Sequence, residues 1–477
     1  MKPILITVMC CITVCTLNAQ KQKYLSGGYW RKQAMEDVLH NWSTKATDSV
    51  NGMFFTNLNQ NWEPFGSFDQ SPAMIARHLF AYSTGYLMSG DERLLLRAKQ
   101  LLAYLDKHAW DKEYGGWYDQ LDRQGVPTKF TKTTFNQVYC ITGLTLYYFV
   151  TKDSTVLNTI LKANNLLERK VWDNIAGGYY DVMNRDWSVQ STGKSFSSEI
   201  TPASGYYFYL YLATRDQRYL DQLRKIMNMV KGKMIDANSG WVLESFDRNW
   251  KYNYSSVENK EINIGHNIET AWMYLRLYLL TQDEKFLAEA KKLGNKVEQF
   301  GFNASNGCWY AYVAKLNPSL HSDLSYWWIQ AYGNMYNLIF YSIEPQQKRL
   351  DDFRKGAEFW DTFFVDKQNG DTYQGVNVAG EPVDPVKGNF FKASYHNLEN
   401  SLLVWLYLDL WVNKKPVKLY FSVENSDNLT LYPLPIEEKD YRILTATWNG
   451  KKIGETSGNA VKLPEHRGKV EVVLESR

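Results

Sequence analysis

Two short segments of the chain contain residue types that can move protons. Gly265–Trp272 has the sequence Gly-His-Asn-Ile-Glu-Thr-Ala-Trp, and Lys392–Asn397 has the sequence Lys-Ala-Ser-Tyr-His-Asn. The chain has only seven histidines in 477 residues, and each segment holds one of them at the start of a strongly apolar stretch. An imidazole has an unperturbed pKa of about 6.5, so two that face one cavity can remove a proton and return it. The expected chemistry is proton transfer at a weakly acidic C–H, such as the one beside a sugar carbonyl.

The first segment can place several functional groups on one face of a helix. His266, Glu269 and Trp272 follow each other at intervals of three, so an imidazole, a carboxylate and an indole can face the same cleft. We expect Glu269 to orient the imidazole or to bind sugar hydroxyls. His396 begins the second apolar stretch. A single histidine in an apolar helix is more often a core residue, but two, each followed by an asparagine at the start of a helix, favour a functional role.

An arginine in another apolar stretch is a further candidate. Arg77 lies in Ala76–Ser83, where a buried guanidinium could stabilise the negative oxygen of a developing enolate; a core salt bridge is the structural alternative. His78 is adjacent and points about a quarter-turn away, so it is less suited to catalysis. The remaining histidines lie in polar contexts and are expected on the surface or in loops: His40, His108, His321 and His466.

The N-terminus and the net charge limit the class of protein. Residues 1–19 have the form of a secretory signal, with Lys2, an apolar stretch over 4–17 and Ala19 before a cut at Gln20. No later stretch is apolar for the roughly 18 residues that a membrane span requires. We therefore expect a secreted or periplasmic protein. The net charge of +3 gives no reason to expect nucleic acid or an anionic membrane as a partner.

The cysteine and aromatic contents point to a large core and to sugar binding. Beyond the signal the chain keeps Cys140 and Cys308, which form neither a disulfide framework nor a metal-ligand spacing, so we expect two buried thiols and no metal site. Aromatic residues are abundant, with 17 Trp, 33 Tyr and 22 Phe. Aromatic rings stack on the apolar faces of sugars and also fill cores. Both uses are expected here.

A turn in which aromatic residues follow a glycine recurs six times, and this repeat predicts the fold. The turns contain Gly52, Gly116, Gly178, Gly240, Gly307 and Gly370, at intervals of 62 to 67 residues. A glycine turn, a short aromatic strand and a polar turn predict a small β-hairpin. Two helical patterns fill each interval, one apolar on most faces and one charged. The predicted helices span 28–48, 71–89, 92–108, 133–151, 155–170, 200–214, 217–233, 265–281, 284–299, 324–342, 347–364 and 394–411.

Twelve helices in six hairpins predict an all-α (α/α)6 toroid, in which the inner helix ends and the loops of one rim line a single cleft. We assign it to residues 20–412. From 413 the pattern changes, because Val417, Leu419 and Phe421 alternate with mostly polar residues. Residues 413–477 are therefore expected to form a small β-rich appendage. At roughly 60 residues it would be marginal alone, so we expect it to pack on the barrel, as a structural cap or as a sugar-binding module.

Three short segments of the chain together resemble the N-acylglucosamine 2-epimerase superfamily. The resemblance is carried by residues 265–272, by Trp-Trp-Ile-Gln-Ala at 327–331 and by residues 392–397, in the same order and spacing. The branch that looks most similar holds cellobiose and mannobiose 2-epimerases and aldose–ketose isomerases. The resemblance extends over about 28–412. It implies an (α/α)6 enzyme that acts on a mono- or oligosaccharide without a cofactor, and we expect a monomer or a homodimer.

The resemblance also implies a role for each candidate residue. His396 and His266 would be the general acid/base pair, Glu269 would support His266, and Arg77 would bind near the carbonyl or ring oxygen. The implied stacking residues are Trp272 and Trp328, and the further substrate-binding candidates are Asn267, Tyr332, Lys392 and Tyr395. Removal of the C2 proton would give an enediolate. Its reprotonation on the opposite face of C2 would invert that carbon, whereas reprotonation at C1 would give a ketose.

Two departures from the family keep other functions open. The epimerases have a glutamate where this chain has Tyr332, and many members carry a histidine on the third inner helix, which is absent from Glu199–Tyr206. A non-catalytic carbohydrate-binding protein is one alternative. A glycoside hydrolase or lyase on the same toroid is another, and a hydrolase would need two carboxylates that face the cleft. Its loop candidates, none in a recognisable pair, are Glu63, Asp69, Asp119, Asp181 and Glu199.

Overall fold

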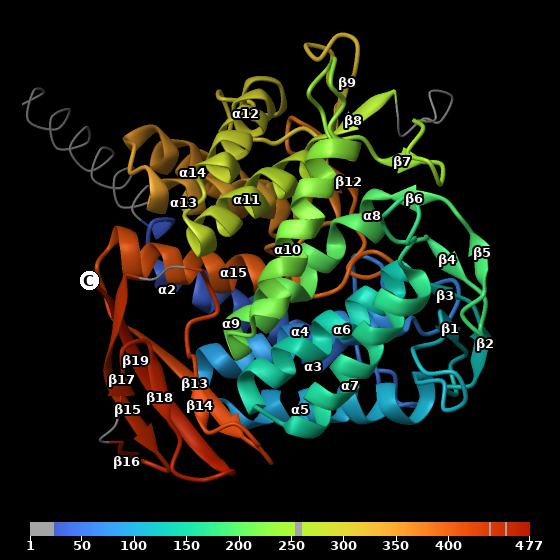
Figure 1. Cartoon of the computed structure of the whole chain (residues 1–477). Helices are drawn as coiled ribbons and strands as arrows, with labels where there is room; N and C mark the ends of the chain where they lie inside the picture. The colour runs from blue at the N-terminus through green and yellow to red at the C-terminus, as the bar shows by residue number, and fades with distance from the viewer. Residues whose placement is uncertain (1–22, 253–259, 438–439, 454–455) are drawn as a thin grey trace, which may run out of the picture.

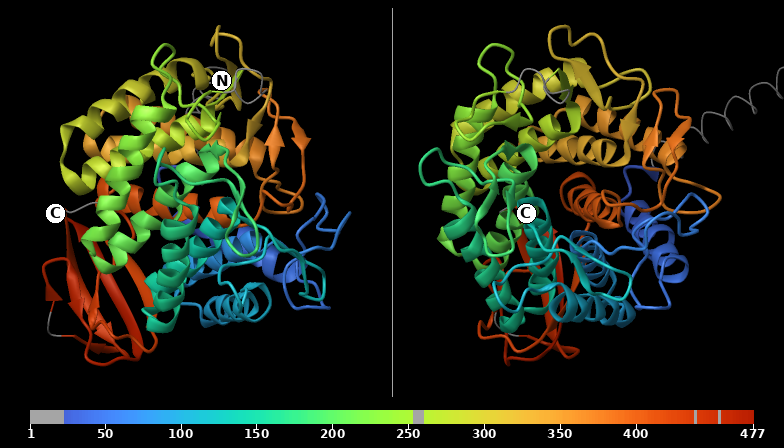
Figure 2. Two further views of the ribbon diagram at one scale, coloured as in Figure 1. Left: turned by 45° about the vertical axis from the view of Figure 1, so that its right-hand side comes forward. Right: turned by 90° about the vertical axis from the view of Figure 1, so that its right-hand side faces the viewer.

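The computed structural model describes residues 23–252, 260–437, 440–453 and 456–477, and the predicted signal at 1–19 lies outside these ranges. Within them, no helix is long and apolar enough to cross a membrane. The helices form two concentric layers around a central axis, with a β-rich appendage at one end (Figures 1 and 2). The predicted (α/α)6 toroid is confirmed.

The inner layer consists of apolar helices that are buried along almost their whole length. They carry hydrophobic residues on every face because they contact the outer layer on one side and the opposite wall of the barrel on the other. The third of them is a composite of several pieces. The other inner helices in the described chain are α4 (Pro72–Ser89), α6 (Thr134–Thr151), α11 (Ile264–Thr281), α13 (Trp327–Ile343) and α15 (Tyr395–Tyr407), which continues as the π-helix η8 (Leu408–Val412).

The third inner helix is interrupted near its start. It consists of α8 (Phe196–Glu199), the π-helix η4 (Ala203–Tyr207) and α9 (Phe208–Thr214). Pro202 lies at the break, where its missing N–H and its ring disfavour a regular helix. The predicted span of 200–214 therefore omitted the first turn, α8, which proves to contribute to the central cavity described below.

The outer helices are amphipathic, and several begin at an aspartate cap. Asp91, Asp153, Asp216 and Asp283 each accept a hydrogen bond from the backbone N–H two residues later, which satisfies a free donor of the first turn. Most of these helices end in a single π-helical turn. The outer helices are α2 (Gly27–Lys32) with η1 (Gln33–Leu39) and α3 (His40–Lys45); α5 (Glu92–Tyr104) with η2 (Leu105–Ala109); α7 (Ser154–Leu166) with η3 (Leu167–Val171); α10 (Gln217–Met229) with η5 (Val230–Met234); α12 (Glu284–Gly301); and α14 (Gln347–Phe359) with η7 (Trp360–Phe364).

The repeated glycine turns connect the outer helices to one rim of the barrel. In the second repeat, Trp110 and Trp117 form a β-bridge across the turn, and Gly115 and Gly116 have φ values of +73° and +74°, which favour glycine. The Asp111 carboxylate caps the turn and also binds Lys132 at 3.1 Å and Arg185 at 3.0 Å. The next repeat has the same arrangement around its own aspartate, so ion pairs join successive repeats along this rim.

Short antiparallel strands complete the same rim. Several of them immediately precede an inner helix, so they mark the N-terminal ends of the inner layer. The strands pair as β1 (Gln120–Leu121) with β2 (Pro127–Lys129); β3 (Lys132–Thr133) with β4 (Val182–Met183) and β5 (Val189–Ser191); β6 (Lys194–Ser195) with β7 (Ser245–Phe246); β8 (Glu261–Asn263) with β9 (Tyr312–Ala314); and β10 (Ser325–Tyr326) with β11 (Gly375–Val376) and β12 (Pro382–Asp384).

The C-terminal appendage packs at the opposite end of the barrel from these strands (Figure 1). Phe421 contacts Phe149 near the end of α6, with ring centroids 6.1 Å apart, and the Glu424 N–H donates to the carbonyl of Thr151 at 2.7 Å. One sheet has the order β13 (Val417–Val423), β19 (Gly468–Ser476), β15 (Tyr441–Trp448), β16 (Lys451–Lys452), and the other has the order β14 (Thr430–Leu431), β18 (Ala460–Lys462), β17 (Thr456–Ser457).

Candidate active site

A cavity of about 430 Å³ opens on the rim that carries the short strands, between the N-terminal ends of the inner helices. We call it the central cavity. In five inner helices, the residue six positions after the N-cap lines it, because helical side chains lean toward the N-terminus. These five residues are Arg77, Tyr139, Thr201, Glu269 and Tyr332. The helical repeat therefore builds a ring of side chains around the barrel axis.

His266 lies on the wall of the central cavity and is paired with a carboxylate that is not among the predicted site residues. Its Nδ1 is 2.8 Å from both carboxylate oxygens of Glu244, which directly precedes β7. The imidazole also stacks on Phe196 of α8, with ring centroids 3.8 Å apart and planes at 10°. Burial disfavours the charged imidazole, but the Glu244 carboxylate outweighs this effect, and together with Glu269 it raises the pKa of His266.

The repeat contains the signal that could have identified Glu244. It stands two residues after the aromatic or aliphatic residue of its glycine turn, as Asp119 and Asp181 do in earlier repeats. Those aspartates accept hydrogen bonds from the N-cap hydroxyls of the next inner helices. In the fourth repeat the longer glutamate side chain reaches a histidine one turn into the helix instead.

His396 lines the same cavity in a different electrostatic environment. It is 6 % exposed, and its ring lies 5.4 Å from that of Tyr332 and 5.7 Å from that of Trp327. Its Nδ1 is buried without a hydrogen-bond partner among the described residues. Burial, reinforced by the positive charges of Arg77, Lys392 and His266, holds the pKa of His396 well below 6.5. The two imidazoles are thus driven toward opposite protonation states, His396 neutral and His266 charged.

Trp328 lies between the two histidines. Its ring centroid is 5.1 Å from that of His266 and 6.3 Å from that of His396. Gly265 permits this position, because a Cβ atom there would clash with the Trp328 ring. An indole flanked by two imidazoles provides an apolar face on which a sugar ring can stack, with a proton donor or acceptor on either side.

Arg77 and Glu269 supply the charged groups of the ring around the axis. The Arg77 guanidinium lies 3.7 Å from the centre of the Tyr139 ring and donates to the Phe391 carbonyl at 2.6 Å. No carboxylate forms an ion pair with it in the described chain, so the alternative of a core salt bridge is not what the structure shows. Burial raises the pKa of Glu269, although His266 and Arg77 oppose the shift.

Four predicted substrate-binding residues do not line the central cavity. Trp272 is fully buried behind Tyr332, with ring centroids 5.6 Å apart. Asn267 accepts from the Val242 N–H at 2.9 Å and so holds a glycine turn. Lys392 is buried and donates to the Lys387 carbonyl at 3.1 Å, and Tyr395 donates to Glu399 at 3.2 Å. These expectations are corrected to supporting roles, because each side chain bonds or packs against other residues outside the cavity lining.

The support that Glu269 gives to His266 is electrostatic and involves no hydrogen bond in the described structure. The carboxylate that hydrogen-bonds the imidazole is that of Glu244, and Glu269 acts on His266 through its charge. Of the predicted site residues, the structure brings Arg77, His266, Glu269, Trp328, Tyr332 and His396 together around one cavity. His78 is buried between Trp42 and Phe54 and bonds Ser394, away from this group.

The two departures from the family pattern both fall on the cavity wall. Tyr332 lines the cavity and contacts Trp328 and His396 edge-on. Burial raises the pKa of its phenol, so it stays neutral at physiological pH. On the third inner helix, Ser197 and Thr201 line the cavity with small hydroxyl groups. The wall therefore has a neutral phenol and small hydroxyl groups at these two places.

The carboxylates considered for a hydrolase are engaged elsewhere. Glu199 accepts from the Tyr179 N–H at 2.8 Å, and Asp119 and Asp181 bind N-cap hydroxyls. Glu63 and Asp69 bond Asn59 and Gln120. Among the described residues that line the central cavity, Glu269 is the one carboxylate, whereas hydrolysis by the common mechanism uses two. No group of three or more His, Cys, Asp or Glu side chains in the described chain could hold a metal ion.

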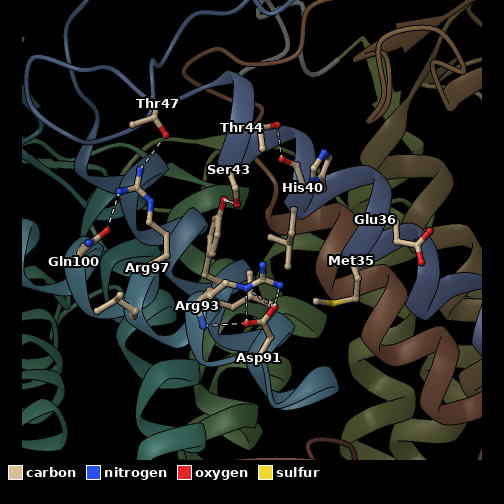
Figure 3. Close-up of a pocket in the computed structure, with 14 residues that line it drawn as sticks. Met35, Glu36, His40, Ser43, Thr44, Thr47, Asp91, Arg93, Arg97 and Gln100 are labelled. Carbon is tan, nitrogen blue, oxygen red and sulfur yellow. Dashed lines mark hydrogen bonds and ion pairs between the residues drawn. The ribbon is translucent and has the colours of Figure 1, made fainter.

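A larger cavity, about 880 Å³, lies on the outer wall between the first outer helix and α5 (Figure 3). His40, Ser43, Thr47, Arg93 and Arg97 are among its lining residues. Its polar groups largely satisfy each other, as Arg97 bonds Gln100 at 3.1 Å and Ser43 bonds Tyr82 at 2.7 Å. None of the predicted site residues lines this outer cavity.

Comparisons with known proteins identify a family and a fold. A sequence model of the N-acylglucosamine 2-epimerase (GlcNAc 2-epimerase) family matches residues 52–399. The cellobiose 2-epimerase of Bacteroides fragilis is 25 % identical over 385 residues, which cover 77 % of this chain and 95 % of that enzyme. The D-mannose isomerase of Marinomonas mediterranea is 21 % identical over 243 residues, 49 % of this chain and 61 % of that enzyme.

Solved structures share the fold at low sequence identity. The cellobiose 2-epimerase of Bacillus thermoamylovorans superimposes with a TM-score of 0.73 at 20 % identity, over 80 % of this chain and 98 % of that one. A family 76 α-mannanase of Bacteroides thetaiotaomicron superimposes less well, with a TM-score of 0.56 at 16 % identity, over 80 % of this chain and 96 % of that one.

Proposed function

Because the chain belongs to the N-acylglucosamine 2-epimerase family, we propose that it is a carbohydrate isomerase that inverts C2 of a reducing-end aldose or converts the aldose to its ketose. The observation that carries this proposal is the pair of imidazoles on one cavity with opposite pKa shifts. A neutral imidazole and an imidazolium on either side of a substrate are the base and the acid that a 1,1- or 1,2-proton transfer needs.

The reaction begins once the sugar ring has opened and exposed its aldehyde. His396, neutral and without a partner on Nδ1, removes the C2 proton of the epimer whose C2–H faces it. The electron pair of the C–H bond forms the C1–C2 double bond, and the aldehyde oxygen takes the negative charge of an enediolate. His266, charged and held by Glu244, then donates a proton to the opposite face of C2. Carbon 2 is inverted, and no redox change occurs.

The opposite epimer reacts with the roles reversed. In either direction one imidazole is charged and the other is neutral, so both directions need the same overall charge on the pair. The free enzyme restores its starting state by moving that proton between the imidazoles through solvent. Donation to C1 in place of C2 gives the ketose, and the position of the enediolate relative to the donor decides between the two products.

Arg77 and Trp328 are suited to bind the reacting sugar. Arg77 lines the cavity with its guanidinium unpaired by any carboxylate of the described chain, so it can stabilise the enediolate oxygen. Trp328 offers a ring face between the two imidazoles. Tyr332, Ser197 and Thr201 would give this enzyme a more neutral wall than its relatives have, which favours a substrate other than the common disaccharides.

The cellular location and the oligomeric state of the enzyme are also proposals. The form of residues 1–19 favours export to the periplasm or beyond, where the substrate would be an oligosaccharide or a sugar released from one. The protein would act as a monomer or a homodimer.

A product assay tests the proposed function. The protein would be incubated with glucose, mannose, cellobiose and mannobiose, and the products identified by carbon NMR. We expect an epimer or a ketose with the glycosidic bond intact, no product from His396→Asn, and unchanged turnover in Glu381→Gln, which alters an exposed glutamate away from the cavity. Bond cleavage would favour a hydrolase, and sugar binding without any product would favour a binding protein.

A further inference from the structure

The C-terminal appendage reaches the axis of the barrel from the end opposite the central cavity. The segment from Leu431, the last residue of β14, to Glu437 is largely buried, and Leu434, Ile436 and Glu437 are among its buried residues. The family match ends at residue 399, so this segment lies outside it. Glu437, at the end of this segment, places a buried carboxylate among apolar side chains where the appendage meets the barrel.

Glu437 forms an ion pair with an inner helix. Its carboxylate oxygen accepts from Nε of Arg276 at 2.7 Å and lies 2.5 Å from Nη2 of the same guanidinium, on α11. Both side chains are only 1 % exposed. The guanidinium also lies over Phe208 and Trp272, at 4.2 and 4.9 Å from the ring centres. A charge this deeply buried needs a partner, and the appendage supplies it.

A second carboxylate continues this arrangement toward the central cavity. Glu399 on α15 accepts from the Tyr209 hydroxyl at 3.0 Å and from the Tyr395 hydroxyl at 3.2 Å. The Tyr395 ring contacts His396, with centroids 4.8 Å apart, and the Arg77 guanidinium lies 5.9 Å from its centre. Tyr209 itself lies 5.3 Å from the Arg276 guanidinium. Charged and hydroxyl groups thus form a continuous buried column from the appendage to the residues beside His396.

One guanidinium in this column faces two carboxylates. When Glu437 neutralises Arg276, little positive charge remains to stabilise an ionised Glu399. Burial then raises the pKa of Glu399 to about 7, against the opposing effect of Arg276 and the Tyr209 hydroxyl. The titratable groups that act on Glu399 from the helices packed around it are Arg276 and Glu269 of α11, Tyr209 of α9, Tyr395 of its own helix, Tyr332 of α13 and Tyr139 of α6.

We propose that Glu437 of the appendage is a positioning residue for the active site, which acts by occupying Arg276 so that Glu399 keeps its proton and its hydrogen bonds beneath His396. The appendage is then more than a structural cap, because it sets the charge under the catalytic pair from the far end of the barrel. The consequence for turnover rests on the proposed isomerase function, whereas the consequence for Glu399 does not.

Infrared difference spectroscopy measures the charge on Glu399 without any assay of activity. The band of a protonated buried carboxyl that disappears in Glu399→Gln belongs to Glu399, and it should titrate near pH 7 in the full-length protein. In Glu437→Gln, the unpaired Arg276 should attract the Glu399 carboxylate, and the band should be lost at neutral pH. A Glu399 band that titrates identically in this variant and in the wild type would overturn the proposal.

A double variant covers the case in which Glu437→Gln does not fold. Arg276→Met with Glu437→Met removes the ion pair as a unit, a change that apolar packing often tolerates. If Glu437 neutralises Arg276 in the wild type, removing both should leave the Glu399 band titrating close to its wild-type pH. A band that persists to much higher pH in this variant would overturn the proposal, because it would show that Arg276 acts on Glu399 even when it is paired with Glu437. Glu424→Gln is the matched control, because Glu424 joins the same appendage to the barrel through Lys99, away from the axis.

The activity measurement then links this charge to the active site. In Glu437→Gln, the ionised Glu399 should raise the pKa of His396, so the acidic limb of the kcat/KM profile should move to higher pH, and adding Glu399→Gln should cancel that movement. A shifted Glu399 titration with an unmoved profile would overturn the link to the active site. Absence of isomerase activity in the wild type would refute the proposed function, while the infrared titration would still decide whether Glu437 controls Glu399.

Discussion

Replacing Glu244 with glutamine should remove the charge that keeps His266 protonated. Both carboxylate oxygens lie 2.8 Å from Nδ1, and both side chains are mostly buried. Glutamine keeps the shape and can still accept a hydrogen bond, but it carries no charge. Burial would then act unopposed by Glu244, and the pKa of His266 would fall.

The size of the effect follows from the geometry. Two unit charges about 4 Å apart at an effective dielectric constant of about 20 interact by about 4 kcal/mol. Since about 1.4 kcal/mol corresponds to a factor of ten, complete loss of this interaction would reduce kcat/KM by close to 10³-fold. The remaining hydrogen bond and partial access of water reduce the loss, so we expect about 10²-fold at neutral pH.

The pH profile distinguishes this explanation from a general structural defect. Activity requires one charged and one neutral imidazole, so it falls at high pH when His266, the group with the raised pKa, becomes neutral. It falls at low pH as His396 gains one, below 6.5 because the pKa of His396 is lowered. In Glu244→Gln the alkaline limb should move to lower pH while the acidic limb stays in place. A variant that retains the wild-type kcat/KM and the wild-type alkaline limb would show that the Glu244 charge does not keep His266 protonated.

Four further variants test other parts of the account. His396→Asn should lower kcat by about 10⁴-fold, so that no product is detected, because it removes a base but no stacking surface. Sugar affinity, measured by calorimetry, should change little, and weaker binding with an unchanged kcat would contradict this. Gly265→Ala should push Trp328 from its position between the imidazoles and lower kcat/KM by about 10²-fold, a loss that should be absent if the indole does not position the sugar. Trp272→Phe should leave KM unchanged and lower the free energy of unfolding by about 1–3 kcal/mol in denaturant titrations, since Trp272 is buried behind the cavity wall. An increase in KM alone would show instead that Trp272 stacks on the sugar. Asp111→Asn should lower the free energy of unfolding by about 3–5 kcal/mol, because it leaves Lys132 buried without its counter-ion. Burial raises the pKa of Asp111, but Arg185 and Lys132 outweigh burial and lower it, so the carboxylate stabilises the wild type above about pH 4 and this stabilisation is lost on acidification. Equal loss of stability on acidification in the two proteins would contradict this.

The helical architecture could be predicted because each element carries its own signal. The 3.6-residue pattern and the recurring glycine turns are local, and they placed the helices of both layers to within a few residues. The third inner helix is the exception. The structure has a break at Pro202, inside the predicted helix 200–214, and the short turn α8 before it has too few residues to show periodicity.

The site was predicted as far as helix periodicity determines it. His266 and His396 could be recognised as partners because both begin apolar helices, and the structure places both on one cavity. Glu244 could not be found in this way, because it lies 22 positions before His266 in a different element. Spacing alone also misassigned Trp272, since a residue that shares a helix face with the site can lie one turn too deep to reach the cavity.

Exchange of the C2 proton with solvent in D2O is the strictest test of a mechanism in which one of His266 and His396 removes a proton from C2 and the other returns one. Each epimer of a substrate pair would be incubated separately with the wild type, with His266→Asn and with His396→Asn, and its C2 proton followed by NMR. We expect the wild type to isomerise both epimers with deuterium incorporation. Each single variant should exchange the C2 proton of one epimer only, His266→Asn the one that faces His396 and His396→Asn the other, without forming the inverted product. Exchange of both epimers by the same variant, or loss of exchange from both epimers in both variants, would contradict it.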